Sequence, residues 1–563
     1  MFFRWASGSV GFSPLQSQST KHRRASYIQL LGGINSALHE ELASETDGAQ
    51  ASAPSLKEPS LSKRPKQGPQ QPTPAPETMN LSTHSPMFSR RRMIQLCGMA
   101  ALAGPSFGQT ASPNNTVRIG VIGCGSRAQG LAAQFVKIKD VSIVALCDAD
   151  SARVDSTAKG LEKRGVDLSR VAKFQDYRKL LERSDIDAVV IASPNHWHTL
   201  HAIHAMQAGK DVYLEKPVSH ELWEGRQLVA AQIKTGRMLA AGFQSRSDPG
   251  PKDGFQFVRE GNMGKILEVH ICCFKDRTGI GKRTTPLVPP PSVDYNLWLG
   301  PAADQPLFRD QFHYDWHWAW NTGNGDIGNQ APHEIDLTNR LLGDGAMPSE
   351  VRSVGSRFGW NDAGETPNMQ LAWYEIAGVP VTLEVNDLQL TPKRKVTPVR
   401  DGIRVGLVVR CEGGQLRGGL GGTYAVGEDG KTTIKKFPGN GGASHQSNFI
   451  DAVRSRRSAD IASQIVLAEK ASAIAHLANL SYRSGGLGDR ASLEQLVGAN
   501  VSVSRILADH AKQLVDWGIT EPKYTVGRAI QVEPASGKVL TTGIAESLIR
   551  RTCRPEFTVP EVG

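Results

Sequence analysis

The sequence predicts an α/β protein in which a doubly wound parallel sheet is followed by at least one further domain. Short runs rich in β-branched residues alternate with helical stretches from Val117 to about residue 242. A glycine-rich turn follows the first of these runs, as in sheets that bind nucleotides. The chain has 563 residues, which exceeds what one hydrophobic core supports and indicates two or three domains.

The overall composition is that of a globular protein. Apolar residues make up 39% and charged residues 21%, and no window approaches the roughly 20 apolar residues that a membrane span needs, so no stable membrane insertion is expected. The net charge is +10, and half of it falls in residues 1–92. The rest forms no basic stripe, so nucleic acid is not an expected partner. The seven cysteines show neither a metal-binding nor a disulfide pattern.

The first part of the chain predicts an export signal that lies far from residue 1. Residues 1–78 are predicted to be a disordered or mis-annotated extension, because much of this part is rich in Ser, Pro and Gln. Residues 79–108 contain paired arginines, a short apolar run and small residues, an order that resembles the bacterial twin-arginine signal. This predicts a periplasmic or otherwise exported protein. The alternative is a solvated basic cluster before an ordinary helix.

The predicted domain at residues 117–242 opens with a dinucleotide-binding turn. Gly123, Gly125 and Ala128 form a GxGxxA pattern after the first strand, and a helix is expected from Ala128 to Lys137. Ser126 and Arg127, which stand between the second glycine and this helix, are further candidates for cofactor binding. The first glycine permits the tight turn, the second lets the backbone approach a pyrophosphate, and the helix N-terminus offers N–H groups. Such a pattern alone is weak evidence for a dinucleotide site, because glycine-rich turns are common, so the residues that follow it also have to fit.

Several later residues complete the predicted cofactor site. Asp148 ends the next strand, VSIVALCD, where a carboxylate binds the adenosine ribose and repels a 2′-phosphate, which favours NAD over NADP. Further strands are expected at 187–192, 211–214 and 238–243. Loops at their carboxyl ends supply the remaining candidates, namely Pro194, Asn195, His198, Glu215 and Lys216. The alternative interpretation of Lys216 is that it is an ordinary surface lysine before a proline in a turn. His196, His201 and His204 are interpreted as helix-start and surface residues.

Three segments, VRIGVIGCGSRAQG, SPNHWHTLHAIHAMQAGKDVYLEKP and GNGDIGNQAPHEIDL, occur in this order. Together they resemble the Gfo/Idh/MocA oxidoreductases, the glucose-fructose oxidoreductase and inositol dehydrogenase family. The resemblance runs from Val117 to the C-terminus, and only about residues 484–520 look like an insertion. The GNQ-containing form resembles an exported subgroup often found near sugar-degrading enzymes.

The resemblance implies a second, C-terminal α/β domain, residues 243–563, with a large and mostly antiparallel sheet that covers the nicotinamide and mediates a homo-oligomer, a dimer or tetramer. The run ILEVHICCF at 266–274 fits such a sheet, because its apolar residues alternate. The resemblance also implies that Lys216 touches the substrate and the nicotinamide ribose and that His333 is the general acid/base. The dehydrogenases have aspartate where this chain has Asn329, and Asp326 is a candidate to compensate.

The segment HYDWHWAW, residues 313–320, is the candidate sugar-binding segment. If it is extended, Tyr314, Trp316, Trp318 and Trp320 line one face, and His313, Asp315 and His317 line the other. Aromatic rings beside polar groups suit a sugar, although packing in the core is the ordinary role of such rings. Trp316, Trp318, Asp326 and His333 are therefore the candidate substrate residues, and no metal is expected.

These features predict an NAD(P)-dependent oxidoreductase that acts on a sugar, cyclitol or glycoside hydroxyl and holds its cofactor tightly. Tight binding is expected because an exported enzyme meets no pool of free NAD. The first alternative is an NAD-dependent glycosidase or lyase that works through a transient keto-sugar. The second alternative is a non-catalytic sugar-sensing protein.

Overall fold

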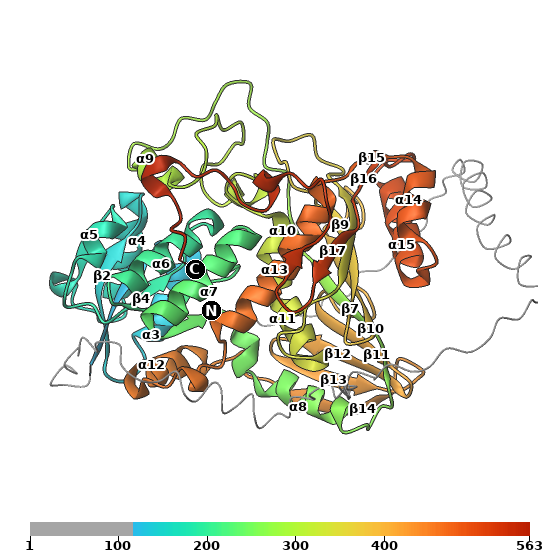
Figure 1. Ribbon diagram of the computed structural model, residues 1–563, viewed down its shortest axis with the longest axis horizontal. Coiled ribbons are helices and arrows are strands. Elements are labelled where there is room, and N and C mark those ends of the chain that lie inside the picture. The colour runs from blue at the N-terminus through green and yellow to red at the C-terminus, as the bar shows by residue number, and fades with distance from the viewer. Residues whose placement is uncertain (1–115, 563) are drawn as a thin grey trace, which may run out of the picture. The chain divides into compact units, whose positions relative to one another are not determined.

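The computed structural model describes residues 116–562 (Figure 1). The predicted extension at residues 1–78 and the predicted twin-arginine signal at residues 79–108 lie outside the described residues. Within the described residues, no helix is both long and apolar enough to cross a membrane.

The first sheet has six parallel strands in the order β3-β2-β1-β4-β5-β6. This confirms the predicted doubly wound sheet, whose strand order reverses between β1 and β4. The strands are β1 (Val117–Ile122), β2 (Val141–Cys147), β3 (Ala172–Phe174), β4 (Ala188–Ile191), β5 (Asp211–Leu214) and β6 (Leu239–Ala241).

Helices cover both faces of this sheet because its strands carry apolar residues on both faces. Ile119 and Val121 pack with the helix residues Leu131 and Val154 on one face. Ile122 faces the opposite side, in a second core. The helices of this part are α3 (Ser126–Phe135), α4 (Ser151–Glu162), α5 (Tyr177–Leu181), α6 (His198–Gln207) and α7 (Leu222–Thr235).

The second sheet contains twelve strands within residues 116–562, in the main order β14-β13-β12-β11-β7-β10-β9-β8-β16-β15. Only β7 and β10 pair in parallel, so the expected mostly antiparallel sheet is confirmed. The strands are β7 (Ile266–Phe274), β8 (Glu350–Ser356), β9 (Met369–Ile376), β10 (Val379–Asn386), β11 (Val405–Cys411), β12 (Gly414–Gly419), β13 (Gly422–Val426), β14 (Thr433–Pro438), β15 (Gly486–Gly488), β16 (Tyr524–Val526), β17 (Ile530–Glu533) and β18 (Lys538–Val539).

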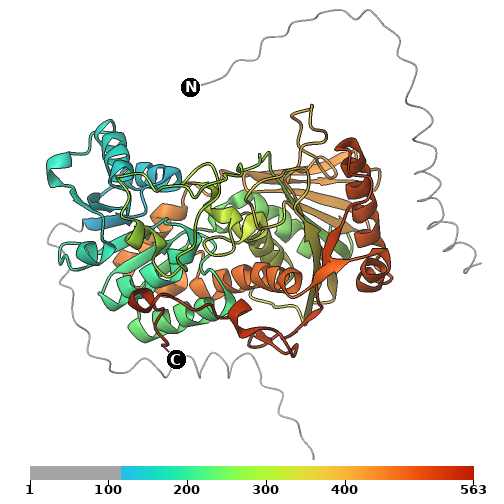
Figure 2. The same ribbon diagram turned by 90° about the horizontal axis from the view of Figure 1, so that it is seen from above.

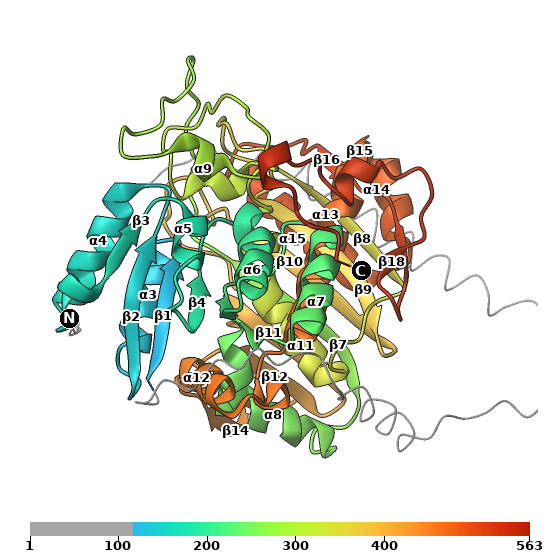
Figure 3. The ribbon, with the colours of Figure 1, turned by 60° about the vertical axis from the view of Figure 1, so that its left-hand side comes forward.

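One continuous core joins the two sheets. Val269 and Ile271 of β7 pack with residues of the helices that lie between the sheets, where Figures 1 and 3 place α7 and α13. His270 points to the opposite face of β7 and is also buried, because helix α15 covers that side. The helices of this part are α8 (Pro249–Arg259), α9 (Tyr295–Leu299), α10 (Gly325–Asn329), α11 (Ala331–Leu342), α12 (His445–Ser455), α13 (Ile465–Arg483), α14 (Arg490–Val497) and α15 (Val501–Asp516).

Late segments of the chain return to the first sheet. Phe449 of α12 contacts Phe135 of α3, with ring centroids 6.3 Å apart. Near the C-terminus, Arg551 donates hydrogen bonds to Glu221 and Glu224 at the start of α7. The two sheets are therefore not built from two uninterrupted halves of the sequence.

Two long segments connect elements of the second sheet and its helices. The strap, residues 275–324, links β7 to α10 and forms the long green loop at the top of Figure 1. The predicted insertion, residues 484–520, contains β15, α14 and α15. Its two helices cover the outer end of the second sheet, as Figures 1 and 2 show.

Candidate functional site

A cavity of about 800 Å³ lies at the carboxyl ends of the first sheet's strands. Its wall begins at the turn between β1 and α3. Gly123 has φ of 85°, and a Cβ there would lie 2.5 Å from the backbone nitrogen of Ser193, so only glycine fits. Gly125 precedes α3, and no side chain caps its N-terminus. The first N–H groups of α3, which starts at Ser126, are thus available to a phosphate, and this arrangement fits a dinucleotide.

Asp148 lies at the end of β2 on the same cavity wall. Its carboxylate accepts hydrogen bonds from the backbone N–H groups of Cys124, at 2.6 Å, and Asp150, at 2.9 Å. Burial raises the pKa of Asp148 above its ordinary value, against the lowering effect of these two bonds. The two bonds fix the orientation of the carboxylate, which suits recognition of ribose hydroxyls.

The loops after β4 and β5 are joined by His198. Its Nδ1 lies 2.6 Å from the carbonyl oxygen of Pro217, and its Nε2 lies 2.8 Å from that of Ser193. In the second loop, Nε of Arg127 donates a hydrogen bond of 2.8 Å to the buried carboxylate of Glu215. These contacts hold both loops against the glycine turn. Pro194, Asn195, His198, Glu215 and Arg127 all line the cavity.

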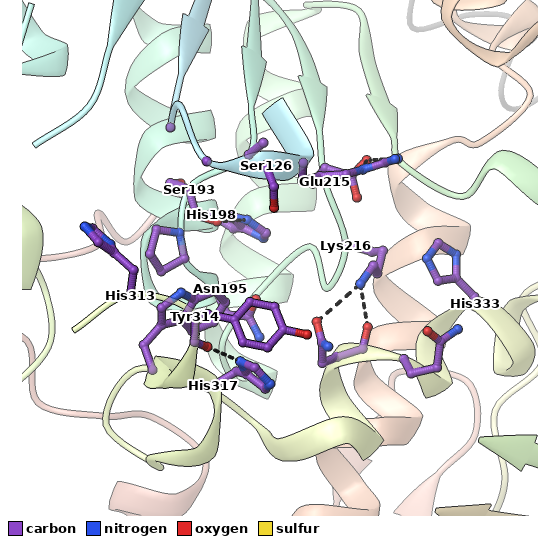
Figure 4. A pocket seen from close by; sticks show the side chains of 18 of the residues that line it. Ser126, Ser193, Asn195, His198, Glu215, Lys216, His313, Tyr314, His317 and His333 are labelled. Carbon is purple, nitrogen blue, oxygen red and sulfur yellow. Dashed lines mark hydrogen bonds and ion pairs between the residues drawn. The ribbon is translucent and has the colours of Figure 1, made fainter. Parts of the chain in front are cut away.

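Lys216 places its amine in the cavity (Figure 4). Its Nζ donates a 2.5 Å hydrogen bond to the backbone carbonyl oxygen of Asn329, and the side-chain Oδ1 of Asn329 lies 3.4 Å away. Burial lowers the pKa of Lys216, although the carboxylate of Glu215 opposes this effect. A buried lysine with a lowered pKa is suited to exchange a proton near neutral pH.

His333 lies on α11, beside Lys216 (Figure 4). Its ring packs edge-on against Phe243, with centroids 5.6 Å apart. Burial, with the positive charge of Lys216, holds the pKa of His333 well below its ordinary value. The imidazole is therefore neutral at pH 7 and able to accept a proton. The predicted pair of amine and imidazole is thus brought to one cavity, the amine from the loop after β5 and the imidazole from α11.

Asp326 does not line the cavity, which corrects its prediction as a substrate residue. It is fully buried, and the guanidinium of Arg277 donates to both of its oxygens at 2.8 and 2.9 Å. This charge, against the effect of burial, lowers its pKa. Asp326 also accepts a 3.1 Å hydrogen bond from the amide of Asn329. It therefore orients Asn329, while the contact partner of His333 is Phe243.

The prediction that residues 313–320 are extended is wrong. Asp315–Trp318 forms a 3-10 helix, and Tyr314 before it has φ of 68°. Alternation of the side chains is lost, so Tyr314, Trp316 and His317 line the cavity together. Trp318 does not line it, which corrects its prediction as a substrate residue. Its ring is 2% exposed and packs under Arg357.

His317 is a further candidate substrate residue. The sequence pattern had placed it on the opposite face of the segment from Tyr314 and Trp316. Its Nδ1 contacts the carbonyl oxygen of Tyr314, which only accepts hydrogen bonds, so Nδ1 carries the proton. Its buried Nε2 has no partner among residues 116–562. Burial lowers the pKa of His317 to about 4. Nε2 is thus an acceptor available to a hydroxyl group of a ligand.

The other histidines near β4 are not surface residues, contrary to their interpretation from sequence. His196 is fully buried, with its Nε2 3.1 Å from the carbonyl oxygen of Trp298. His201 is buried and stacks on Trp197, with centroids 4.2 Å apart. His204 is half-buried. Their contacts with the strap and with neighbouring rings give them a packing role, as expected for groups that do not take part in catalysis.

The strap is hydrogen-bonded to the residues that follow Asp148, at one end of the cavity. Backbone hydrogen bonds join Ser151 to Ser292 at 3.0 Å and Asp294 to Ala149 at 2.8 Å. Nε2 of His313 lies 2.8 Å from Oδ2 of Asp150. The strap therefore encloses the groove beside Asp148 from the side opposite the sheet.

Further residues line the cavity that the sequence did not single out. They come from the strap, from α4 and from α11, and include Arg153, Lys275, Trp298, Gln330, Glu334 and Leu337. Within the described residues, no group of three or more His, Cys, Asp or Glu side chains is placed to hold a metal ion.

Comparisons with known proteins identify both domains. Residues 117–243 match the Gfo/Idh/MocA family model described as oxidoreductase family, NAD-binding Rossmann fold. Residues 258–375 match the model of the same family described as C-terminal alpha/beta domain. The first domain is therefore an NAD-binding Rossmann domain.

Curated relatives match parts of the chain. A glycosyl hydrolase family 109 protein of Solibacter usitatus is 36% identical over 163 residues, which cover 26% of this chain and 37% of that protein. Inositol 2-dehydrogenase 4 of Saccharopolyspora erythraea is 27% identical over 278 residues, 48% of this chain and 67% of that protein. The chain thus spans well under half of the first relative.

Solved structures show similarity at low identity. Aldose-aldose oxidoreductase from Caulobacter crescentus is 16% identical, with a TM-score of 0.47, over 64% of this chain and 97% of that chain. The WlbA dehydrogenase from Bordetella pertussis is 19% identical, with a TM-score of 0.46, over 65% and 95%.

Proposed function

We propose that this chain, which carries both domains of the Gfo/Idh/MocA oxidoreductases, uses NAD to oxidise a hydroxyl group of a sugar, cyclitol or glycoside. One observation carries the proposal: Lys216 and His333 line the same cavity as the glycine turn that fits the dinucleotide. When bound, NAD supplies the hydride acceptor for the carbon that bears the hydroxyl group.

The chain's own residues accept the proton of the hydroxyl group and bind the substrate. Neutral His333 takes the proton of the hydroxyl group, and Lys216, held by Asn329, donates a hydrogen bond to the same oxygen. Nε2 of His317 accepts a hydrogen bond from a neighbouring hydroxyl. Trp316 offers an apolar surface for the C–H face of a sugar ring.

The strap supports the proposal that the cofactor is held tightly. Because the strap is bonded to the end of β2 and the start of α4, release of a dinucleotide requires the contact between His313 and Asp150 to open. Such retention fits an exported enzyme, which meets little free NAD. Export, and assembly into a dimer or tetramer, are parts of the same proposal.

The alternative is an NAD-dependent glycosidase that passes through a transient keto-sugar without net oxidation. It is favoured by the names of the curated relatives, four of which are glycosyl hydrolase family 109 proteins with 35% or 36% identity. A non-catalytic sugar sensor is disfavoured, because a sensor has no need of a buried amine and imidazole with lowered pKa values.

The test is to purify the protein and measure its bound dinucleotide, then to add a panel of sugars, cyclitols and glycosides without further cofactor. We expect bound NAD, and a rise in the reduced-nicotinamide absorbance with at least one compound. Lys216→Met should abolish that rise. A protein that binds no dinucleotide when NAD is supplied in excess would overturn the proposal.

A further inference from the structure

Glu334 is a carboxyl group on the cavity wall that oxidation of a hydroxyl group does not use. Gln330, His333, Glu334 and Leu337 all line the cavity. Counted from Gln330, the residue before α11, they stand at positions i, i+3, i+4 and i+7, so one face of this helix is turned to the cavity. Glu334 therefore shares that face with the proposed base His333.

The surroundings of Glu334 differ from those of other buried acids near the site. Nε2 of Gln330 donates to its two oxygens at 3.1 and 3.2 Å, and the thiol of Cys273 lies 3.7 Å away. No Lys, Arg or His nitrogen of residues 116–562 forms an ion pair with it. By contrast, Glu215 is paired with Arg127.

Burial of an acid that has no ion-pair partner raises its proton affinity, because the charged form loses its contact with water. Burial raises the pKa of Glu334 to about 7, against the lowering effects of the hydrogen bonds from Gln330 and of the charges of Lys275 and Lys216, neither of which forms an ion pair with it. Both the protonated and the ionised forms are thus populated near neutral pH, as a group that takes up and returns a proton requires. Unlike Glu469, which has a similarly raised pKa, Glu334 lies on the cavity wall, where a ligand can reach it.

We propose that Glu334 exchanges a proton with the carbon next to the carbonyl group of an oxidised sugar, which makes glycosides the substrate class. This inference rests on the proposed function, because that function supplies the ketone. The carboxylate of Glu334 takes the proton of the neighbouring C–H bond, the electron pair of that bond forms a C=C bond, and the carbonyl oxygen becomes an enolate oxygen. The ammonium form of Lys216 stabilises that oxygen.

The enolate has two outcomes. Where the next carbon bears a glycosidic oxygen, the electron pair re-forms the carbonyl group and makes a new C=C bond as the C–O bond breaks. The leaving oxygen takes a proton from water. Where no leaving group is present, Glu334 returns a proton to the carbon, and in D2O this proton is deuterium.

The experiment supplies the ketone directly, so that hydride transfer is bypassed. Methyl 3-keto-glucopyranosides and 3-keto-galactopyranosides of both anomers are incubated in D2O with holo-protein, and proton NMR follows the C–H signal at position 2. The wild-type protein is expected to exchange or eliminate this proton with at least one compound. Glu334→Gln is expected to be at least about 100-fold slower, in line with loss of a general base.

Glu469→Gln is the matched control. Glu469, on α13, is another acid whose pKa burial raises to about 7, but it lies outside the cavity wall. This variant should exchange at the wild-type rate. Infrared difference spectra should also show protonated-carboxyl absorbance that titrates near pH 7, and each of the variants Glu334→Gln and Glu469→Gln should remove a part of it.

The outcomes separate this inference from the proposed function. Wild-type-like exchange by Glu334→Gln, or no exchange by the wild-type protein with any of the keto-glycosides, overturns the role of Glu334. Neither result touches the proposed hydroxyl oxidation, which is judged by the nicotinamide absorbance with unoxidised sugars. If that absorbance never rises while Glu334-dependent exchange occurs, the proposed function fails and the proton-exchange site remains.

Discussion

The amine of Lys216 donates to the backbone carbonyl oxygen of Asn329 at 2.5 Å and lies 3.4 Å from its side-chain oxygen. The loop after β5 of the first sheet is thereby fixed to α10, beside the second sheet. Because asparagine carries no charge, Lys216 gains a hydrogen bond at position 329 but no ion pair. The identity of this residue therefore tunes the proton affinity of the lysine.

Asn329→Asp should raise the pKa of Lys216. A carboxylate at hydrogen-bond distance stabilises the ammonium form, and we expect an upward shift of about one pH unit or more. The pH dependence of reduced-nicotinamide formation measures it. Asn329→Ala keeps the backbone carbonyl and lacks the added charge, so it should show no upward shift. Equal pH profiles for the aspartate and alanine variants would contradict this account.

Lys216→Met should lower turnover by about 1000-fold or more, because both the hydrogen bond to the substrate oxygen and the positive charge are lost. Bound NAD should remain, since the glycine turn and Asp148 are untouched. Lys252→Met, an exposed position on α8, is the control and should be fully active. Turnover is measured by product formation, and cofactor content by its absorbance after denaturation.

His313→Ala should speed the release of bound dinucleotide by about tenfold, because it removes a strap contact of the kind that contributes about 1 kcal/mol or more. The measurement is the loss of reduced-dinucleotide fluorescence after an acceptor protein is added in excess. Asp155→Asn removes an exposed ion pair with Lys173 on α4 and β3 and serves as the control. Unchanged release by His313→Ala would show that the strap does not retain the cofactor.

Asp148→Ser should weaken the preference for NAD over NADP by about 10- to 100-fold. The carboxylate repels a 2′-phosphate, and nearby Arg153, which also lines the cavity, attracts one once the acid is removed. Competition binding to protein stripped of cofactor measures the ratio of the two dissociation constants. An unaltered ratio would mean that Asp148 does not face the ribose.

Glu384→Gln should destabilise the fold by about 3 to 5 kcal/mol at neutral pH. Burial alone would raise the pKa of Glu384. Hydrogen bonds from His270 and His510 instead hold this pKa well below its ordinary value. A lowered pKa contributes stability that is present above the unfolded-state value near 4.5 and is lost as the pH falls below it. The difference in free energy of unfolding between the two proteins should therefore narrow below about pH 4.5 in urea titrations. A difference that is constant from pH 7 to pH 3 would contradict this origin.

Local patterns in the sequence were sufficient for the parallel sheet and for β7. Strand periodicity and the glycine turn depend on near neighbours, and β7 begins and ends at Ile266 and Phe274, the two ends of its predicted run. The end of a predicted strand made Lys216 a candidate, and the family resemblance added His333; the fold brings both to one cavity.

Long-range packing decided what local patterns missed. The backbone of His317, in the 3-10 helix at residues 315–318, lies directly against Gly323, where a Cβ would be 2.2 Å from it, and an alternating pattern does not encode this close approach. His196 was interpreted as a surface or helix-start residue, but its ring is buried against Trp298 of the strap. Glu334, in contrast, was within reach of sequence reasoning, since it stands four positions after Gln330 on the helix face that carries His333.

The most direct measurement uses a sugar that carries deuterium on the carbon bearing the reactive hydroxyl, added to holo-protein in a single turnover. Mass spectrometry of the released dinucleotide then shows whether the label has moved. We predict that the reduced dinucleotide from the wild-type protein gains one deuterium and that the dinucleotide from Lys216→Met gains none. Turnover of the labelled sugar with no deuterium in the dinucleotide would contradict the account.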